Sequence, residues 1–281
     1  MTDDDTGRPS REVMEQMART LRPFRFLASP VLSGLENIPA ERPLLFVGNH
    51  GLFGVLDAPL LISELYRATG IILRPLGDDL HFQVPVWGWA SRRLGAVAAS
   101  PEACARLMRA GETILVFPGG AREASKRKGE KYKVVWGNRT GFARLAIEHA
   151  CTIVPFCCVG IEDAFDIVLD ADEILASPVG RALQRLGMRR DLVWPLVKGI
   201  GPTPLPRPER LYFRFEPPVE TASYGRRAED ADRCNDLRDR VKAAIERSIE
   251  QVLVDREADP ERHLGARLAR RFGRQSLKKM P

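Results

Sequence analysis

Residues 44–68 read LLFVGNHGLFGVLDAPLLISELYRA and place three kinds of segment in immediate succession. The run 44–48 is apolar, has the length of a strand and ends in glycine, which predicts a buried β-strand. His50 follows almost at once. Asp57 is a plausible N-cap, and Pro59 is compatible with a first helical turn, so we predict a helix over 57–68. A strand, a polar loop and a helix in this order form the basic unit of a parallel α/β sheet.

The same alternation continues to about residue 160. Strands are predicted over 71–76, 95–99, 113–117 and 152–159, and helices over 84–94, 101–110 and 140–149. Farther along, 211–215 alternates like a strand, and 228–256 carries apolar residues at helical spacing. We therefore predict an α/β fold: a mixed, mostly parallel sheet flanked by helices, with an N-terminal helical lead and a C-terminal amphipathic helix.

The two ends of the chain differ in character from its middle. Residues 1–10 predict a disordered lead, and 11–29 predict an amphipathic helix interrupted at Pro23, which either lies on a membrane or packs on the core. After Glu261 no acidic residue occurs, and the basic residues are Arg262, Arg267, Arg270, Arg271, Arg274, Lys278 and Lys279. We divide the chain into a lead and helix over 1–34, an α/β domain over 35–225, and a helix with a basic tail over 226–281.

The net charge of +6 indicates an anionic partner, either nucleic acid, an acidic membrane surface or a phosphorylated small molecule. Walker, zinc-finger and RNP-like motifs are absent from the sequence, so no nucleic-acid partner is expected. The five cysteines include no C-x-x-C pair, which favours free thiols in a reducing compartment. The start MTDDDTG is not a secretory signal, and no long apolar run occurs. We expect a cytoplasmic protein that lies peripherally on the inner face of the membrane.

Two stretches carry candidate chemistry. His50 follows a strand end, where open α/β sheets place their sites, and a nearby carboxylate such as Asp57 would orient it as a general base. The turn FPGGARE at 117–123 offers glycines that let N–H groups approach an anion, and Arg122 that can hold a phosphate or an oxyanion. Each has a plainer interpretation, as a loop histidine or as a tight turn. The basic run at 126–133 is either a solvated loop or a phosphate contact.

The order NH…D, then FPGGARE, then GFARLA, then IVPF resembles the lysophospholipid acyltransferase superfamily over about residues 35–175. The closer resemblance is to its diacylglycerol-acyltransferase and phytyl-ester-synthase-like branch. The resemblance implies that His50 is the catalytic base. The family's acid would fall on Val55, so Asp57 is the nearest candidate to support the histidine. The implied substrate contacts are Phe117, Pro118, Gly119, Gly120, Arg122 and Glu123.

The departures from the family pattern concern the acceptor. The family's second block usually ends in arginine, whereas this chain has Ser100 and Pro101. Gly119 stands where the phosphatidate-forming enzymes carry glutamate, which favours a neutral acceptor, such as diacylglycerol or a long-chain alcohol, over glycerol 3-phosphate. A lysophospholipid remains open. The last of the family's four sequence motifs falls on Val154 and Pro155, and the resemblance implies that these residues form part of the wall of the site.

The activity implied by the resemblance is direct transfer of an acyl group from acyl-CoA to a lipid hydroxyl, with acyl-CoA as donor substrate, no permanently bound cofactor and no metal. No H-E-x-x-H occurs in the sequence. A serine hydrolase would need a G-x-S-x-G elbow, which is missing. A non-catalytic lipid-binding relative of the same fold is the remaining alternative.

Overall fold

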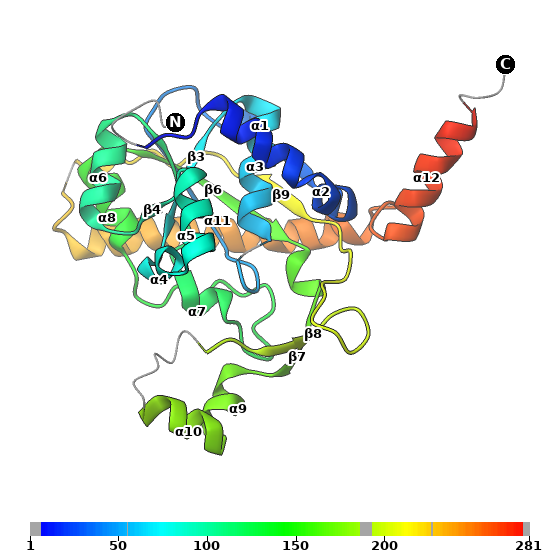
Figure 1. The fold of residues 1–281 in the computed structure, drawn as a ribbon. Coiled ribbons are helices and arrows are strands. Elements are labelled where there is room, and N and C mark those ends of the chain that lie inside the picture. The colour runs from blue at the N-terminus through cyan, green and yellow to red at the C-terminus, as the bar shows by residue number, and fades with distance from the viewer. Residues whose placement is uncertain (1–6, 55, 186–192, 226, 278–281) are drawn as a thin grey trace.

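The computed structural model describes residues 7–54, 56–185, 193–225 and 227–277. Its centre is a seven-stranded sheet in the order β1-β9-β6-β2-β5-β3-β4 (Figure 1). The strands are β1 (Val31–Ser33), β2 (Leu44–Gly48), β3 (Leu73–Gly77), β4 (Val97–Ala98), β5 (Thr113–Val116), β6 (Thr152–Val159) and β9 (Tyr212–Phe215). Only the β6–β9 pairing in this sheet is antiparallel. The predicted mixed, mostly parallel sheet is confirmed.

β2 occupies the middle of the sheet and pairs in parallel with β5 on one side and β6 on the other. All five of its residues are buried, as expected for a strand covered on both faces. Its carboxyl end therefore opens at the centre of the sheet edge, which is where the His50 loop begins.

Helices cover both faces of the sheet. One face packs against α1 (Arg11–Thr20) and α3 (Asp57–Thr69), with Met14, Leu60 and Phe46 fully buried there. The other face packs against α6 (Pro101–Arg109), α8 (Gly141–Glu148) and α11 (Ala231–Glu257). Each large apolar side chain buried in this way contributes about 1.5–3 kcal/mol.

The N-terminal helix breaks into α1 and α2 (Arg22–Ala28), because Pro23 cannot continue the hydrogen bonding of α1. Ser10 caps α1 by accepting from the N–H of Val13. α1 packs against α3, so its apolar face lies on the core. Residues 1–6 of the predicted disordered lead lie outside the described residues.

The remaining elements join or extend this body. Among the described residues they are α4 (Asp79–Gln83), α5 (Pro85–Arg93), α7 (Gly120–Ala124), α12 (Leu264–Leu277) and short 3₁₀ turns at Leu35–Asn37, Ile161–Asp163 and Ala222–Tyr224. The region 161–210, irregular in sequence, forms an arm of β7 (Asp166–Leu169), α9 (Ala171–Ala176), α10 (Pro178–Arg185) and β8 (Leu196–Lys198). The arm projects from the body, as does α12 (Figure 1).

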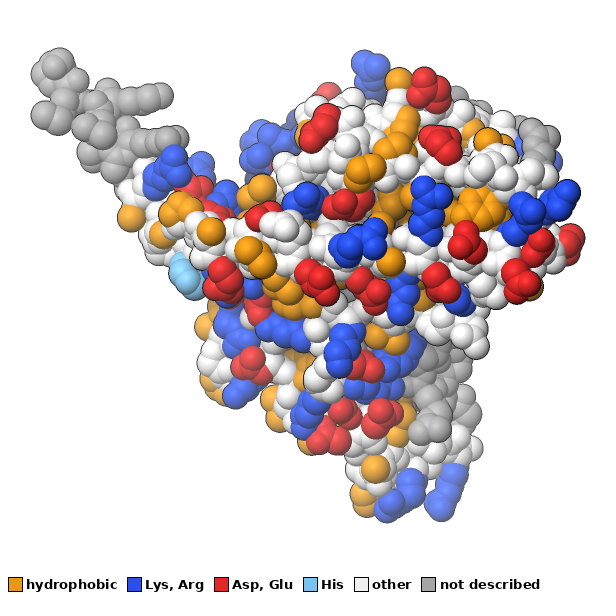
Figure 2. Space-filling model, turned by 180° about the vertical axis from the view of Figure 1, so that it is seen from behind, with side chains coloured by type: hydrophobic (Ala, Val, Ile, Leu, Met, Phe, Trp, Pro, Cys, Tyr) orange, Lys and Arg blue, Asp and Glu red, His pale blue; other side chains and the backbone are white. Residues whose placement is uncertain are grey.

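Two local predictions need correction. Asp57 is the first residue of α3 and not its N-cap, which is Leu56, because the Asp57 carboxylate turns back toward the preceding loop. The predicted helix 84–94 is α5, preceded by the separate short helix α4. Among the described residues, no helix combines the length and the apolar character needed to cross a membrane. The rear of the molecule carries interspersed acidic and basic side chains (Figure 2).

Candidate active site

The loop that carries His50 is tied firmly to the sheet. The Asn49 side chain donates to the carbonyl of Cys158 (2.9 Å) and accepts from the N–H of Cys158 (2.8 Å). Asn49 thus extends the β2–β6 pairing by one side chain and ends the strand in a fixed direction. Gly48 allows the ring of Phe156 to approach, because a Cβ at 48 would lie 2.3 Å from that ring. His50 therefore leaves the sheet at a defined position.

Asp57 reaches His50 despite the seven-residue spacing. Its Oδ2 lies 3.3 Å from Nδ1 of His50 and accepts from the N–H of Gly51 at 2.8 Å, while Oδ1 accepts from the N–H of Ala58 at 2.9 Å. Burial raises the pKa of Asp57, but the imidazole of His50 and the two backbone N–H groups together lower the pKa by more than burial raises it. The pKa of Asp57 therefore lies below its ordinary value. The carboxylate is thus charged and is oriented toward Nδ1.

Phe117 and Gly54 confine the imidazole ring of His50. The ring stacks on Phe117, with centroids 4.1 Å apart and planes 6° apart. Gly54, at φ +65°, lies over the other edge, where a Cβ would come within 2.2 Å of both Cε1 and Nε2. The loop between His50 and Asp57 turns through two positive φ values, at Phe53 and Gly54, and this turn lets the acid return to the ring. Val55 lies outside the described residues.

The turn after β5 is fixed by its own backbone and by one arginine. The Gly120 N–H donates to the carbonyl of Phe117 (3.0 Å), so this N–H is already used. Arg139 donates from Nη1 to the carbonyls of Pro118 (3.0 Å) and Gly119 (2.6 Å). The Gly119 N–H has no acceptor within the described parts of the chain, and Gly119 itself is buried.

Arg122 and Glu123 occupy different environments from those predicted. Both terminal nitrogens of Arg122 donate to the carboxylate of Glu130, at 2.9 and 2.5 Å, so an incoming anion would compete with an ion pair. Glu123, predicted as a substrate contact, is fully buried. Its Oε1 accepts from the backbone N–H of Val135 at 3.2 Å, and the nearby His50 lowers the pKa of the carboxyl, although by less than burial raises it. Burial raises the pKa of Glu123.

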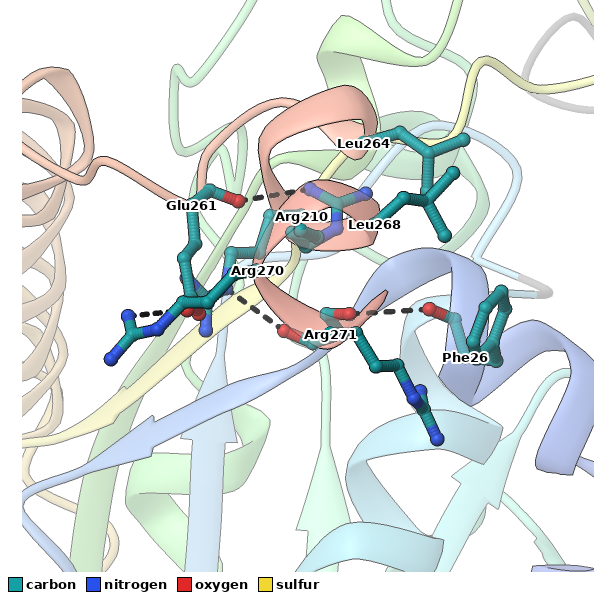
Figure 3. A pocket seen from close by; sticks show the side chains of 9 residues that line it. Phe26, Arg210, Glu261, Leu264, Leu268, Arg270 and Arg271 are labelled. Carbon is teal, nitrogen blue, oxygen red and sulfur yellow. Dashed lines mark hydrogen bonds and ion pairs between the residues drawn. The ribbon is translucent and has the colours of Figure 1, made fainter. Parts of the chain in front are cut away.

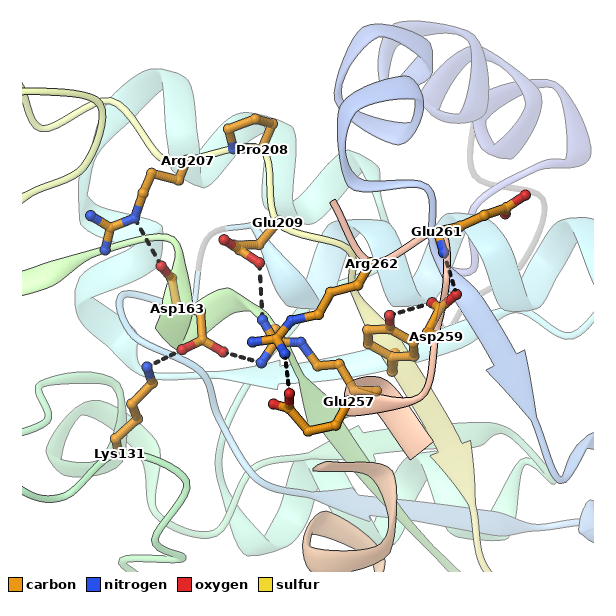
Figure 4. A network of polar contacts seen from close by, with 12 residues as sticks. Lys131, Asp163, Arg207, Pro208, Glu209, Glu257, Asp259, Glu261 and Arg262 are labelled. Carbon is orange, nitrogen blue, oxygen red and sulfur yellow. Dashed lines mark hydrogen bonds and ion pairs between the residues drawn. The ribbon is translucent and has the colours of Figure 1, made fainter. Parts of the chain in front are cut away.

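The basic run at 126–133 is mostly engaged in internal ion pairs. Lys126 is buried beside Glu162 (3.4 Å) and donates to the carbonyl of Lys133. Further pairs join Arg127 to Asp172, Lys128 to Glu173 and Lys131 to Asp163. Asp163 in turn binds Arg256 of α11, which also binds Glu209 (Figure 4). The run is not a ready phosphate site, because acidic residues outside it pair with Lys126, Arg127, Lys128 and Lys131, although Lys128, Lys131 and Lys133 are exposed to solvent.

An apolar groove of about 610 Å³ begins at His50. α1 and α2 line one side, and α5 with the end of β3 lines the other. Its apolar lining includes Val13, Met17, Leu21, Phe24, Leu56, Ile62, Leu76, Phe82, Trp89, Leu94 and Phe117, while Gln16, Thr20, Ser91 and Arg93 are polar. The groove suits a long hydrocarbon chain that ends at the imidazole.

A second hollow lies between α2 and α12 and is strongly basic (Figure 3). Phe26, Leu264 and Leu268 form its apolar part, and its cations include Arg210, Arg267, Arg270 and Arg271. Arg267 donates to the carbonyls of Leu27 and Pro208, which attaches α12 to the body. None of the residues that line this hollow also lines the groove at His50.

The other predicted positions have structural roles. Val154 is fully buried in the core, Pro155 pairs opposite Val47, and neither lines the groove. The hydroxyl of Ser100 caps α6 by accepting from the N–H of Ala103. Among the described residues, no group of His, Cys, Asp or Glu is placed to hold a metal ion. Burial raises the pKa of Cys104 to about 11 and of Cys157 to about 12, as expected for inert thiols.

Several residues that build the site have no local signal in the sequence. The roles of Asn49 and Arg139 depend on Cys158 and on the 118–119 carbonyls, which are distant in sequence. Gly54 gave a usable signal, since a glycine between His50 and Asp57 permits a positive φ.

Comparison with known proteins agrees with this geometry. The Acyltransferase family model matches residues 30–159. The chain is 32% identical over 263 residues to phytyl ester synthase 2, chloroplastic, of Arabidopsis thaliana, covering 85% of this chain but 36% of that relative. It is 30% identical over 132 residues to the human DGAT1/2-independent enzyme synthesizing storage lipids, covering 47% of this chain and 40% of the relative.

The chain thus spans well under half the length of both relatives. Among solved structures, the 1-acyl-sn-glycerophosphate acyltransferase PlsC of Thermotoga maritima shares the fold, with a TM-score of 0.54 and 16% identity, over 85% of this chain and 79% of that one. The family model thus matches the part of the chain that carries the ordered motifs around His50 and Gly119, and the likeness to PlsC concerns the fold.

Proposed function

We propose that the protein transfers a fatty acyl group from acyl-CoA to the hydroxyl of a neutral lipid alcohol, with His50 as the base. The observation that carries this proposal is the position of His50, which is paired with a buried carboxylate on one side and faces an apolar groove on the other. A charged, oriented carboxylate at Nδ1 favours the tautomer in which Nε2 is free to accept a proton.

The chemistry follows from this tautomer. Nε2 takes the proton of the acceptor hydroxyl as its oxygen attacks the thioester carbonyl. The tetrahedral intermediate collapses, the C–S bond breaks, and the imidazolium returns the proton to the departing thiolate. The Gly119 N–H, fixed by the Arg139 contacts on the same turn, would stabilise the developing oxyanion. Asp57 would stabilise the imidazolium between the two proton transfers.

A neutral acceptor fits the lining of the groove better than a phosphorylated one. Arg93 is the cation among the groove residues, whereas most of the lining is apolar. Arg122, which would otherwise hold a phosphate, is paired with Glu130. The names of the relatives, a phytyl ester synthase and an enzyme of storage-lipid synthesis, point the same way. Diacylglycerol or a long-chain alcohol is therefore the favoured acceptor, ahead of a lysophospholipid.

We also propose a peripheral association with an anionic membrane. The basic α2 and the start of α12 meet in the structure, where they surround the hollow of Figure 3. Arg22, Arg25, Arg67, Arg210 and Arg271 line an adjoining hollow. Glu64 and Asp259 neutralise part of this charge. Basic residues near an anionic lipid surface each contribute about 1 kcal/mol.

The test is release of free coenzyme A from a long-chain acyl-CoA by the purified protein. Diacylglycerol, a fatty alcohol and a lysophospholipid are supplied in turn, and the ester product is identified by mass. We expect release that depends on an acceptor and is fastest with a neutral alcohol. Folded protein that binds lipid yet releases no coenzyme A with any acceptor would support the non-catalytic lipid-binding alternative.

A further inference from the structure

Large apolar side chains at the start of α5 are exposed to solvent, whereas most large apolar side chains in a folded protein are buried. Val84 is 55% exposed, Val86 79% and Trp89 63%. We call these three residues the α5 tip. Within the described chain, Val86 and Trp89 are among the most exposed large apolar residues. Withdrawing such side chains from water is worth roughly 1.5–3 kcal/mol each.

The α5 tip adjoins the groove that leads to His50. Trp89 itself lines the groove, together with Phe82 and Leu94 from the same region, while Met17 and Phe24 line it from α1 and α2. Phe26 and Leu27, the next residues of α2 after Arg25, are also exposed, at 40% and 41%. Phe26 lines the separate hollow beside α12, so the strongly exposed apolar side chain that lines the groove itself is Trp89.

Two arginines in the last turn of α5 complete this surface. The Arg93 guanidinium lies 5.7 Å from the ring centre of Trp89, and that of Arg92 lies 5.1 Å from the ring centre of Phe82. Within the described parts of the chain, neither forms an ion pair with a carboxylate, so both charges are available. Tryptophan is enriched at the membrane interface, and arginine binds lipid phosphates through paired hydrogen bonds.

We propose that the α5 tip inserts into the headgroup layer of a bilayer that contains anionic lipid, with Arg92 and Arg93 on lipid phosphates. The groove then opens directly into the membrane, and a lipid alcohol reaches His50 without crossing water. The inference rests on the proposed function, since it concerns how the lipid substrate enters the same groove. It adds a defined contact surface to the general attraction of the basic ends.

The variants are chosen outside the groove, so that docking is separated from catalysis. Val84 and Val86 do not line the groove, and serine suits position 84, which is the N-cap of α5. Val84→Ser/Val86→Ser therefore removes apolar surface from the tip without touching Trp89. Val254→Ser is the matched control, because Val254 is 65% exposed on α11, which packs on the other face of the sheet.

The measurement is co-sedimentation of the full chain with vesicles of phosphatidylcholine and phosphatidylglycerol, and with phosphatidylcholine alone. We expect wild type and Val254→Ser to bind the anionic vesicles equally. Binding of Val84→Ser/Val86→Ser should be weaker by roughly tenfold or more. Arg92→Gln changes the one of the two arginines that does not line the groove, and it should lower binding to anionic vesicles while changing little with phosphatidylcholine alone.

Several outcomes would overturn the inference. The inference is overturned if wild-type protein binds neither type of vesicle. It is also overturned if Val84→Ser/Val86→Ser co-sediments with anionic vesicles like wild type, because binding would then be assigned to the α2–α12 arginines alone. A double variant that binds vesicles normally but changes from dimer to monomer in sedimentation velocity would assign the tip to a second copy of the chain. Coenzyme A release with detergent-dispersed acceptor is measured in parallel, so a failure of docking is distinguished from a failure of the proposed function.

Discussion

Gly54→Ala should inactivate the protein, because the added methyl group must occupy the place of the catalytic ring. The new Cβ would lie 2.2 Å from Nε2 and Cε1 of His50, against a normal contact of about 3.5–4.0 Å. The imidazole would then have to move by roughly 1.3 Å or more. A shift of that size takes the ring off Phe117 and breaks the 3.3 Å contact with Asp57.

The magnitude has two parts. The positive φ of +65° at Gly54 costs an alanine about 1–2 kcal/mol. Forcing the methyl group against a held ring costs about 1–3 kcal/mol more. Catalysis should fall by about 10²–10⁴-fold, the usual range for loss of a general base.

Gly111→Ala is the matched control. Gly111 has a similar φ of +70°, but nothing lies within 4 Å of the Cβ position, and it precedes β5 at the end of the strand opposite the site. It should lose about 1–2 kcal/mol of stability and keep its rate of coenzyme A release. Urea unfolding and coenzyme A release are measured on both variants. A Gly54→Ala protein as active as Gly111→Ala would refute the assigned role of the ring.

Three further predictions follow from the buried polar groups. Asp57→Asn keeps only one carboxylate oxygen, so at least one of the three groups that donate to Asp57 (His50, Gly51 and Ala58) loses its acceptor. Coenzyme A release should fall by about 10²-fold or more, and the free energy of unfolding by about 1–3 kcal/mol. Near-normal kinetics would count against the His50–Asp57 pair. Burial raises the pKa of Glu162 to about 7, an effect that Lys126 only partly offsets. The native state thus favours the protonated carboxyl, and its stabilisation, complete below the usual pKa near 4.5, is lost as the pH rises through about 7; urea unfolding should show this decline in wild type and a flatter profile in Glu162→Gln, whereas equal profiles would contradict it. All five cysteines are buried, and burial raises the pKa of Cys151 to about 12; they should resist a thiol reagent at pH 8 until denaturant is added, and rapid labelling of the native protein would be inconsistent with these positions.

The parts of the fold predicted well from sequence are those with a local cause. β2 and β6 appear as short buried runs, and α11 follows an apolar stripe that begins after its cap, Asp230. The position of His50 follows from the same logic, because it comes directly after a central strand.

What the sequence could not predict depends on the path of the chain between distant residues. The return of Asp57 to His50 needs two consecutive positive φ values, at Phe53 and Gly54, and phenylalanine rarely adopts one. The burial of Glu123 depends on Gly119, where a Cβ would lie 2.4 Å from the Glu123 side chain. Gly119, predicted to bear on the acceptor, thus also makes room for a buried carboxylate.

The charges of the basic run show the same limit. Lys128 forms an ion pair with Glu173 because the arm that carries α9 folds back onto the 126–133 loop. No local feature of the sequence predicts this contact. Part of the run is exposed to solvent, as one of the two interpretations predicts, but the run also connects its loop to the arm and, through Asp163, to α11.

The most direct test of the account is His50→Ala, assayed for both chemistry and binding. Coenzyme A release with the best acceptor is compared with binding of a fluorescent fatty alcohol in the groove. If His50 is the base and the groove holds the lipid, release falls by about 10²–10⁴-fold while the alcohol binds as in wild type. Release at the wild-type rate from His50→Ala would contradict the central claim.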